Sequence, residues 1–262
     1  MRIAVFIKQV PATTEVEIDS ETGVLKRGLA KGKLNPFDLF AIESALEIRE
    51  VYGGTVTALT MGPLSAKQSL LEAVYMGADD ACILSGAQFA GSDVLATSRA
   101  LAGAVCTLEG FDLIICGKQT TDGDTAQVGA QTAEWLGIPH VTGVVSVISA
   151  EEGALTVGVE TEDFRQTVNL PLPCLICMDK NINTPRLPSF LRKKNNSELV
   201  IREIRLGDLA DTDENSYGIE GSPTRVVRIF EPEPNNKSER LEGEAQDVAR
   251  KLFEMLSSER MI

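Results

Sequence analysis

Histidine and tryptophan are almost missing from this sequence of 262 residues, which contains one of each, His140 and Trp135. Catalytic triads depend on a histidine base and zinc sites commonly use several histidines, so a single histidine argues against both. Basic residues are few, 25 against 38 acidic ones, and the net charge is −13. Binding to nucleic acid needs a cationic surface, so we expect no nucleic-acid partner. Any reaction would take most of its chemistry from a bound cofactor.

Long apolar runs are absent as well. No stretch of the sequence approaches the ~18 consecutive apolar residues of a membrane span, and the apolar run at residues 3–7 is too short for the core of a signal peptide. The five cysteines are an odd number and lie in apolar segments, as is typical of free thiols in a reducing compartment. We therefore expect a cytoplasmic protein without a membrane span.

Cys174 and Cys177 form a C-x-x-C pattern, which occurs in redox and zinc sites. The surrounding residues 172–178 are apolar and indicate a buried strand, and no second Cys or His pair follows to complete a set of metal ligands. We interpret the two cysteines as structural, and we expect no metal site.

The first 145 or so residues alternate short apolar runs with stretches of helical spacing. Near-continuous apolar strands between helices indicate a parallel sheet that is covered on both faces. The sequence therefore predicts an α/β fold of three layers, with strands at 3–8, 55–61, 81–84, 113–116 and 141–148, and helices at 36–52, 65–76, 93–108 and 125–136. A turn signal at 19–23 predicts a small hairpin over residues 15–26.

The pattern changes after residue 150. Residues 155–160 and 165–170 suggest an antiparallel pair, and 171–178 a further strand. A basic, irregular piece follows at 185–194, then a polar stretch at 207–240, and helical spacing returns at 241–261. A segment this polar cannot bury much of itself. We therefore divide the chain into an α/β domain (1–184), a loop (185–196) and a C-terminal arm (197–262) that wraps around a partner.

The stretch from Cys116 to Gly129 is the most informative for function. A buried strand ends at Cys116, and a loop leads to a helix that we expect to begin near Asp124 or Thr125, with Asp124 as its N-cap. Ligands of open α/β sheets bind at the carboxyl ends of the strands. Free amides at a helix N-terminus suit a phosphate or diphosphate.

Three other motifs do not fit this stretch. Gly117-Lys118 lacks the earlier glycine of a P-loop and has Gln119 in place of Ser or Thr, and no G-x-G-x-x-G follows the first strand. Asp122 and Asp124 are typical of a turn and a cap rather than of a metal site. Because two carboxylates beside a phosphate repel it, we expect at least one of them to face ribose or backbone amides.

Four separated motifs resemble the β subunit of electron transfer flavoproteins, in order and at suitable spacing. They are Lys8-Gln9-Val10-Pro11, Leu34-Asn35-Pro36-Phe37-Asp38, Thr60-Met61-Gly62-Pro63 and the run from Gln119 to Gly129. The resemblance implies a flavodoxin-like, adenine-nucleotide-binding domain whose C-terminal extension wraps a partner subunit. That partner is an FAD-bearing α subunit, and the β subunit itself holds AMP or a second FAD.

The same motifs identify the residues that would contact the nucleotide. The adenine nucleotide would lie near the first strand, the start of the first helix and Met61, with its phosphates on the loop before the 125–136 helix. The expected set is Phe6, Lys8, Asn35, Pro36, Phe37, Asp38, Met61, Gly117, Lys118, Gln119, Thr120, Thr121, Asp122, Gly123, Asp124, Thr125, Ala126, Gln127 and Val128. No side chain is expected to act as a catalytic acid or base.

Gly123 favours FAD over AMP. Family members that hold AMP tend to have three consecutive aspartates here, whereas this chain is similar to the electron-bifurcating members, which bind FAD. In that case NADH would give a hydride to this FAD, and electrons would pass to ferredoxin and to the FAD of the α subunit. Two alternatives stay open: a conventional electron transfer flavoprotein that holds AMP, and a freestanding nucleotide-binding protein of the universal-stress type.

The loop at 185–196 lies where the family has its partner-recognition loop. The resemblance implies that Phe190, Leu191 and Arg192 contact a flavoenzyme that is similar to an acyl-CoA dehydrogenase, an enoyl-CoA reductase or a lactate dehydrogenase. The chain would then be an electron-transfer subunit of an NADH-dependent flavin oxidoreductase complex.

Overall fold

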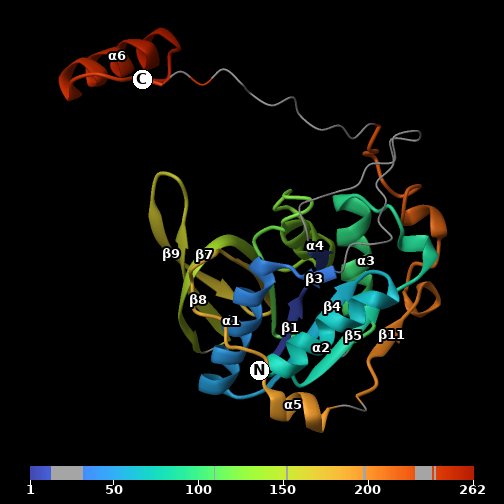
Figure 1. Ribbon diagram of the computed structural model, residues 1–262. Coiled ribbons are helices and arrows are strands. Elements are labelled where there is room, and N and C mark those ends of the chain that lie inside the picture. Colours follow the sequence, from blue (N-terminus) through green and yellow to red (C-terminus); the bar gives the residue numbers. More distant parts are fainter. Residues whose placement is uncertain (13–31, 109, 152, 197–198, 228–237, 239) are drawn as a thin grey trace.

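A nine-stranded sheet forms the centre of the protein, in the strand order β11-β5-β4-β1-β6-β10-β7-β8-β9. Figure 1 shows this sheet between its covering helices. The computed structural model describes residues 1–12, 32–108, 110–151, 153–196, 199–227, 238 and 240–262. The hairpin expected at 15–26 lies outside the described residues. The strands are β1 (Arg2–Phe6), β4 (Thr55–Met61), β5 (Asp80–Leu84), β6 (Leu113–Gly117), β7 (His140–Glu151), β8 (Ala154–Glu160), β9 (Arg165–Pro171), β10 (Cys174–Met178) and β11 (Arg202–Ile204).

Most of the sheet is parallel, as the apolar strands predict. From β11 to β7 every neighbouring pair is parallel, with Phe6 of β1 opposite Leu59 of β4 and Cys116 of β6. The pairs β7–β8 and β8–β9 are antiparallel and extend the sheet at one side. The prediction of an antiparallel pair after residue 150 is therefore confirmed. A separate two-stranded sheet joins β2 (Gln9–Pro11) to β3 (Gly32–Leu34).

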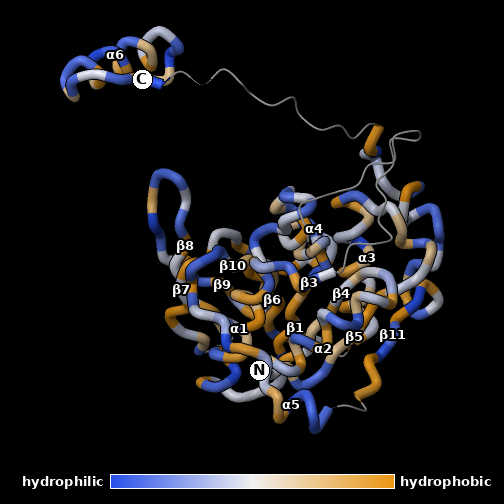
Figure 2. Tube along the Cα trace, in the orientation of Figure 1, coloured by the Kyte–Doolittle hydropathy of each residue, from blue (hydrophilic) through white to orange (hydrophobic). Residues whose placement is uncertain are grey.

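Helices cover both faces of the sheet, which confirms the three-layer α/β fold. The helices α1 (Pro36–Tyr52) and α2 (Lys67–Met76) pack on one face, and α3 (Val94–Cys106) and α4 (Val128–Leu136) pack on the other. Each pair buries its own apolar core against the strands, which run as hydrophobic segments through the middle of the domain (Figure 2). Cys174 lies in the first core and Cys177 in the second, so they point to opposite faces, as expected of structural residues in a buried strand.

Residues between 199 and 222 pack on the α/β domain. β11 adds a parallel strand beside β5, and Ile204, Leu209 and Tyr217 are buried in the core that α3 and α4 cover. The arm expected from residue 197 therefore includes a segment that packs on this chain's own sheet. By contrast, α6 (Ala245–Ser258) has no buried residue and lies away from the sheet (Figure 1).

Shorter elements complete the described part of the chain. They are the 3-10 turns η1 (Leu64–Ala66), η2 (Ala87–Phe89), η3 (Leu206–Asp208) and η4 (Glu214–Ser216), and the short helix α5 (Phe190–Asn195). None of the described helices combines the length and the apolar character that crossing a bilayer requires.

Candidate functional site

The predicted ligand loops meet where the strand order reverses. The chain leaves β1 for β4 and β5 on one side, and then crosses to β6 on the other side of β1. The carboxyl ends of β1 and β6 therefore flank a topological switch point, the usual ligand crevice of an open α/β sheet. Lys8 follows β1, Met61 ends β4, and the loop from Gly117 to Gln127 follows β6.

Asn35 ties the start of α1 to the loop after β6. It occupies the N-cap position with Pro36 at the first helical position, as predicted, but its side chain makes no capping hydrogen bond. Its amide instead donates to Asp38 Oδ1 and to the backbone oxygen of Gln119, both at 2.9 Å, and its oxygen accepts from the amide of Thr121 at 3.3 Å. Because Asn35 is fully buried, these three bonds fix the loop against the helix.

Asp38 is a buried carboxylate at the centre of this junction. It is 4% exposed and accepts hydrogen bonds from the backbone amide of Lys8 at 2.7 Å, from Asn35 and from the amide of Gly117. Burial raises the pKa of Asp38 to about 7, although these donors and the charge of Lys8 act in the opposite direction. A Cβ on Gly117 would lie 2.5 Å from Asp38 Oδ1 and 2.8 Å from the backbone of Phe37, so only glycine allows this close approach.

The carboxylates of Asp122 and Asp124, in the loop after β6, both accept hydrogen bonds from side chains of this chain. Lys8 Nζ donates to the two oxygens of Asp122 at 2.9 and 2.8 Å, which joins the residues after β1 to the loop after β6. Partial burial raises the pKa of Asp122, but the hydrogen bonds and charge of Lys8 outweigh it, so the pKa lies below its usual value. Asp124 accepts a hydrogen bond from Gln119. These partners reduce the repulsion that two free carboxylates would exert on a phosphate.

Lys118 leads to a residue that the sequence interpretation missed. Its amide donates to the oxygen of Met178 at 2.8 Å, and its Nζ pairs with Asp179 at 2.7 Å. Asp179 directly follows β10, so the rule that ligands gather at carboxyl ends of parallel strands could have identified it. The strand ends at the switch point therefore have two lysines beside them, Lys8 and Lys118, each already paired with an aspartate.

The helix after the loop begins later than predicted. α4 starts at Val128 with Gln127 at the N-cap position, so the prediction that Asp124 caps a helix beginning at 124 or 125 is wrong. The physical reason is the backbone, because Asp124 and Ala126 have φ of 51° and 54°, in the left-handed region that interrupts a right-handed helix. Residues 121–125 are exposed, so the loop is open to a ligand at the strand ends.

The N-terminus of α4 sits directly on the strand ends. Cys116 and Cys177 are adjacent on β6 and β10, with their sulfurs 3.4 Å apart, and a Cβ on Gly129 would lie 2.6 and 2.5 Å from them. The hydrogen bond between the thiols and their burial raise the pKa of Cys116 well above its usual value. The thiols thus serve as packing groups that bring the first turn of α4 close to the crevice.

The remaining predicted site residues differ in exposure. Phe6 is buried at the end of β1, and Met61 and Val128 pack against the same apolar core. Pro36, Phe37 and Thr120 are half-buried, and Thr125 is exposed. Within the described ranges, no group of three or more His, Cys, Asp or Glu side chains is arranged to hold a metal ion.

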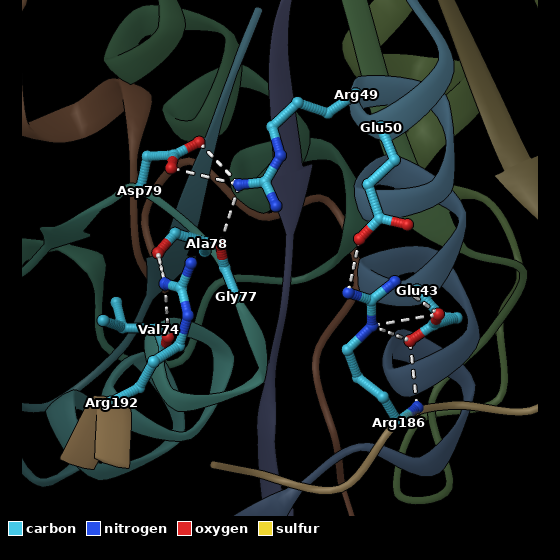
Figure 3. Close-up of polar contacts among 9 residues, drawn as sticks. All are labelled: Glu43, Arg49, Glu50, Val74, Gly77, Ala78, Asp79, Arg186 and Arg192. Atoms are coloured by element: carbon cyan, nitrogen blue, oxygen red, sulfur yellow. Dashed lines mark hydrogen bonds and ion pairs between the residues drawn. The ribbon is translucent and has the colours of Figure 1, made fainter. Parts of the chain in front are cut away.

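The predicted partner contacts lie on α5, which packs beside α2, and they are not alike. Phe190 and Leu191 are 82% and 64% exposed. Arg192 is instead half-buried and directs its guanidinium toward the carbonyls of Val74 and Ala78 (Figure 3). Only the two apolar residues are therefore open to a partner.

An open, mainly parallel α/β sheet with its loops gathered at a switch point defines a doubly wound α/β domain of the nucleotide-binding class. Residues 22–204 match the family described as the electron transfer flavoprotein domain, so the chain belongs to that family. It is 40% identical to the electron transfer flavoprotein subunit beta of Thermoanaerobacterium thermosaccharolyticum over all of both chains. It is also 39% identical to the caffeyl-CoA reductase-Etf complex subunit CarD of Acetobacterium woodii over all of both chains. Protein FixA of Sinorhizobium fredii is 38% identical, over 96% of this chain and 92% of the relative. The chain is thus a β-subunit member of the family.

Proposed function

We propose that this chain is the FAD-binding β subunit of an electron-bifurcating electron transfer flavoprotein. When bound, FAD would supply the redox chemistry by which the two electrons of a hydride from NADH are divided between ferredoxin and the FAD of an α subunit, and through the latter reach a partner flavoenzyme. The chain's own residues bind and orient this nucleotide. The single histidine fits such a role, because no side chain has to act as acid or base.

Gly123 is the observation that carries the choice of FAD over AMP. Its φ lies outside the left-handed region, and a Cβ there would meet only Thr120 Oγ1, at an ordinary 3.5 Å. The fold itself therefore does not require glycine at this position. A bulky ligand that passes over the exposed loop 121–125 would explain why residue 123 has no side chain.

The charges of the crevice suit a diphosphate held mainly by amides. Lys8 and Lys118 pair with Asp122 and Asp179 at these strand ends, and the first turn of α4, which has no side-chain cap, offers backbone amides and the positive end of the helix dipole. If a diphosphate binds, Lys8 could exchange its ion pair with Asp122 for one with a phosphate oxygen. Asp122 could then accept a hydrogen bond from a hydroxyl group of the ribose or ribityl chain.

Exposed apolar residues on α6 and in residues 185–196 support two protein partners, an α subunit and a flavoenzyme. α6 has polar and apolar residues at helical spacing but buries none of them, and its Leu252 and Phe253 are exposed, which supports docking on an α subunit. The similarity to CarD, whose name places it in a caffeyl-CoA reductase–Etf complex, favours an enoyl-CoA reductase-like flavoenzyme as the second partner. Phe190 and Leu191 are its expected contacts.

The cofactor content of the purified heterodimer tests this proposal. Denaturation should release two FAD molecules for each αβ pair, and NADH alone should bleach the flavin absorbance. One FAD and one AMP per pair would overturn the proposal in favour of a conventional electron transfer flavoprotein. A chain that forms a stable homodimer without an α subunit would point to the freestanding alternative.

A substitution at Gly123 separates the two cofactors more sharply. Gly123→Asp places three consecutive carboxylates in the loop, and we expect the β-site FAD to be held at least about tenfold more weakly, through repulsion of the diphosphate and lost space. Gly207→Asp adds the same charge where nothing lies within 4 Å of a new Cβ, and it should leave the FAD content unchanged. Equal FAD content in both variants would show that Gly123 does not select the ligand.

A further inference from the structure

Residues 185–196, which we call the docking segment, are fastened to α1 by one arginine (Figure 3). Arg186 pairs with Glu43 at 2.8 Å and with Glu50 at 2.6 Å, and its backbone amide donates to Glu43 at 2.9 Å. Glu43 is buried, so its carboxylate depends on these bonds. A planar guanidinium that contacts two carboxylates allows only a narrow range of positions for the chain around it.

A second arginine fastens the other end of the docking segment to α2. Arg192 donates to the backbone oxygens of Val74 and Ala78, both at 3.5 Å, and the amide of Ser189 donates to the oxygen of Tyr75 at 2.9 Å. The carbonyls at the end of α2 carry the negative end of the helix dipole, which favours a cation there. The segment therefore bridges two helices of the same sheet face.

The two helices form a fixed platform. Arg49 of α1 donates to the oxygen of Gly77 at 2.9 Å and pairs with Asp79 at 2.9 Å, just beyond α2 (Figure 3). Between the two fastening points, Leu187 and Phe190 are 87% and 82% exposed. Large apolar side chains that are held outward together are uncommon on a monomer surface and mark a contact with another molecule.

We propose that Arg186 is a positioning residue for partner binding: it holds the docking segment on α1 so that Leu187, Phe190 and Leu191 face the partner flavoenzyme already ordered. This inference rests on the proposed function, in which the docking segment contacts that enzyme. Ordering apolar side chains before the encounter lowers the entropy lost on binding. Arg186 itself does not have to touch the partner, because its donors face Glu43 and Glu50.

Hydrogen exchange of the αβ heterodimer tests the fastening directly. Arg186→Met keeps an unbranched apolar stem but removes both ion pairs, and amide exchange in residues 187–196 should rise by about tenfold. Arg205→Met is the matched control, because Arg205 pairs with Glu203 at 3.2 Å, is 75% exposed and lies outside the docking segment. Unchanged exchange in Arg186→Met would overturn the proposal.

Electron transfer to a partner tests the consequence. With an enoyl-CoA-reducing flavoenzyme that accepts electrons from the wild-type heterodimer, Arg186→Met should raise the KM for that enzyme by about tenfold and leave kcat and cofactor content unchanged. Phe190→Ala should also raise this KM. If Phe190→Ala raises it and Arg186→Met does not, the positioning role is overturned while the docking surface stands. If neither does, the docking segment is not the partner surface, and the positioning role of Arg186 is overturned with it, while the proposed FAD content of the β subunit is not affected.

A double substitution distinguishes the ion pair from a general loss of stability. Glu43→Gln removes the same interaction from the other side, so it should raise the KM to a similar extent. In the chain with both substitutions the effects should not add, because the two residues act through one contact. Fully additive effects would overturn the assignment of positioning to the Arg186–Glu43 pair.

Discussion

Replacing Asp38 by asparagine should remove a pH dependence from the stability of the domain. The wild-type carboxyl is buried, with its pKa raised from 3.8 to about 7 by that burial. Between these two values the folded chain keeps the proton and the unfolded chain has lost it. The free energy of unfolding therefore falls as the pH rises from about 4 to about 7, and above pH 7 no further loss arises from this group.

The size of this effect follows from the same two values. One pKa unit corresponds to about 1.4 kcal/mol, so the change from 3.8 to about 7 sets an upper bound of roughly 4 kcal/mol on the stability lost over this range. Asp38→Asn cannot titrate, so its curve of unfolding free energy against pH should be flatter by up to that amount. The absolute stability of the variant also changes, because Lys8 and Asn35 donate to different oxygens of Asp38 and asparagine has an NH2 group in place of one of them. The slope is therefore the quantity to compare.

Urea unfolding of the full chain at pH 4.5, 5.5, 6.5 and 7.5, followed by circular dichroism, measures this slope. We expect the difference in free energy between wild type and Asp38→Asn to become less favourable to the wild type as the pH rises. Parallel curves would refute the reasoning. They would mean that the donors from Lys8, Asn35 and Gly117 hold the carboxylate ionised despite its burial.

Two further substitutions test packing around the site and the role of the C-terminal segment. Gly129→Ala places a Cβ about 2.5 Å from the Cys177 sulfur and should lower the free energy of unfolding by about 1–3 kcal/mol; adding Cys177→Ala should restore part of it, as urea unfolding can measure. Tyr217→Ala removes a buried ring that packs edge-on against Phe89, with centroids 5.3 Å apart, and should cost about 3–5 kcal/mol in the same assay. A loss below about 1 kcal/mol would mean that residues 199–222 are not part of the core.

Helices and strands whose ends are marked by residues close in sequence, such as proline and glycine, could be predicted from the sequence. The helix at Pro36–Tyr52 and the strand at Thr55–Met61 have the bounds that were predicted. The helix has proline at its first position and glycine directly after its end, and both preferences arise within a few residues. The resemblance of the motifs also led to the family that the comparisons show.

The start of α4 and the return of the C-terminal segment could not be predicted in this way. Asp124 has the composition of an N-cap, but its left-handed φ is set by bonds to Thr120 and Gln119, which depend on the folded loop. β11 has only three residues, so it shows no periodicity, and its pairing with β5 depends on contacts more than a hundred residues away in the chain. The fastening of residues 185–196 by Arg186 likewise depends on Glu43 and Glu50, which are distant in sequence.

The place of β11 at the edge of the sheet has a consequence for self-association. An uncovered edge strand offers a row of unpaired amides and carbonyls to other chains, and β5 would be such an edge if the sheet ended there. β11 covers it with a strand of three residues that carries Arg202 and Glu203. Its shortness and charge leave little backbone for another chain to extend. A chain cut before Arg202 would keep every residue of the nucleotide crevice, yet it would expose the apolar strand Asp80–Leu84 to edge-to-edge aggregation.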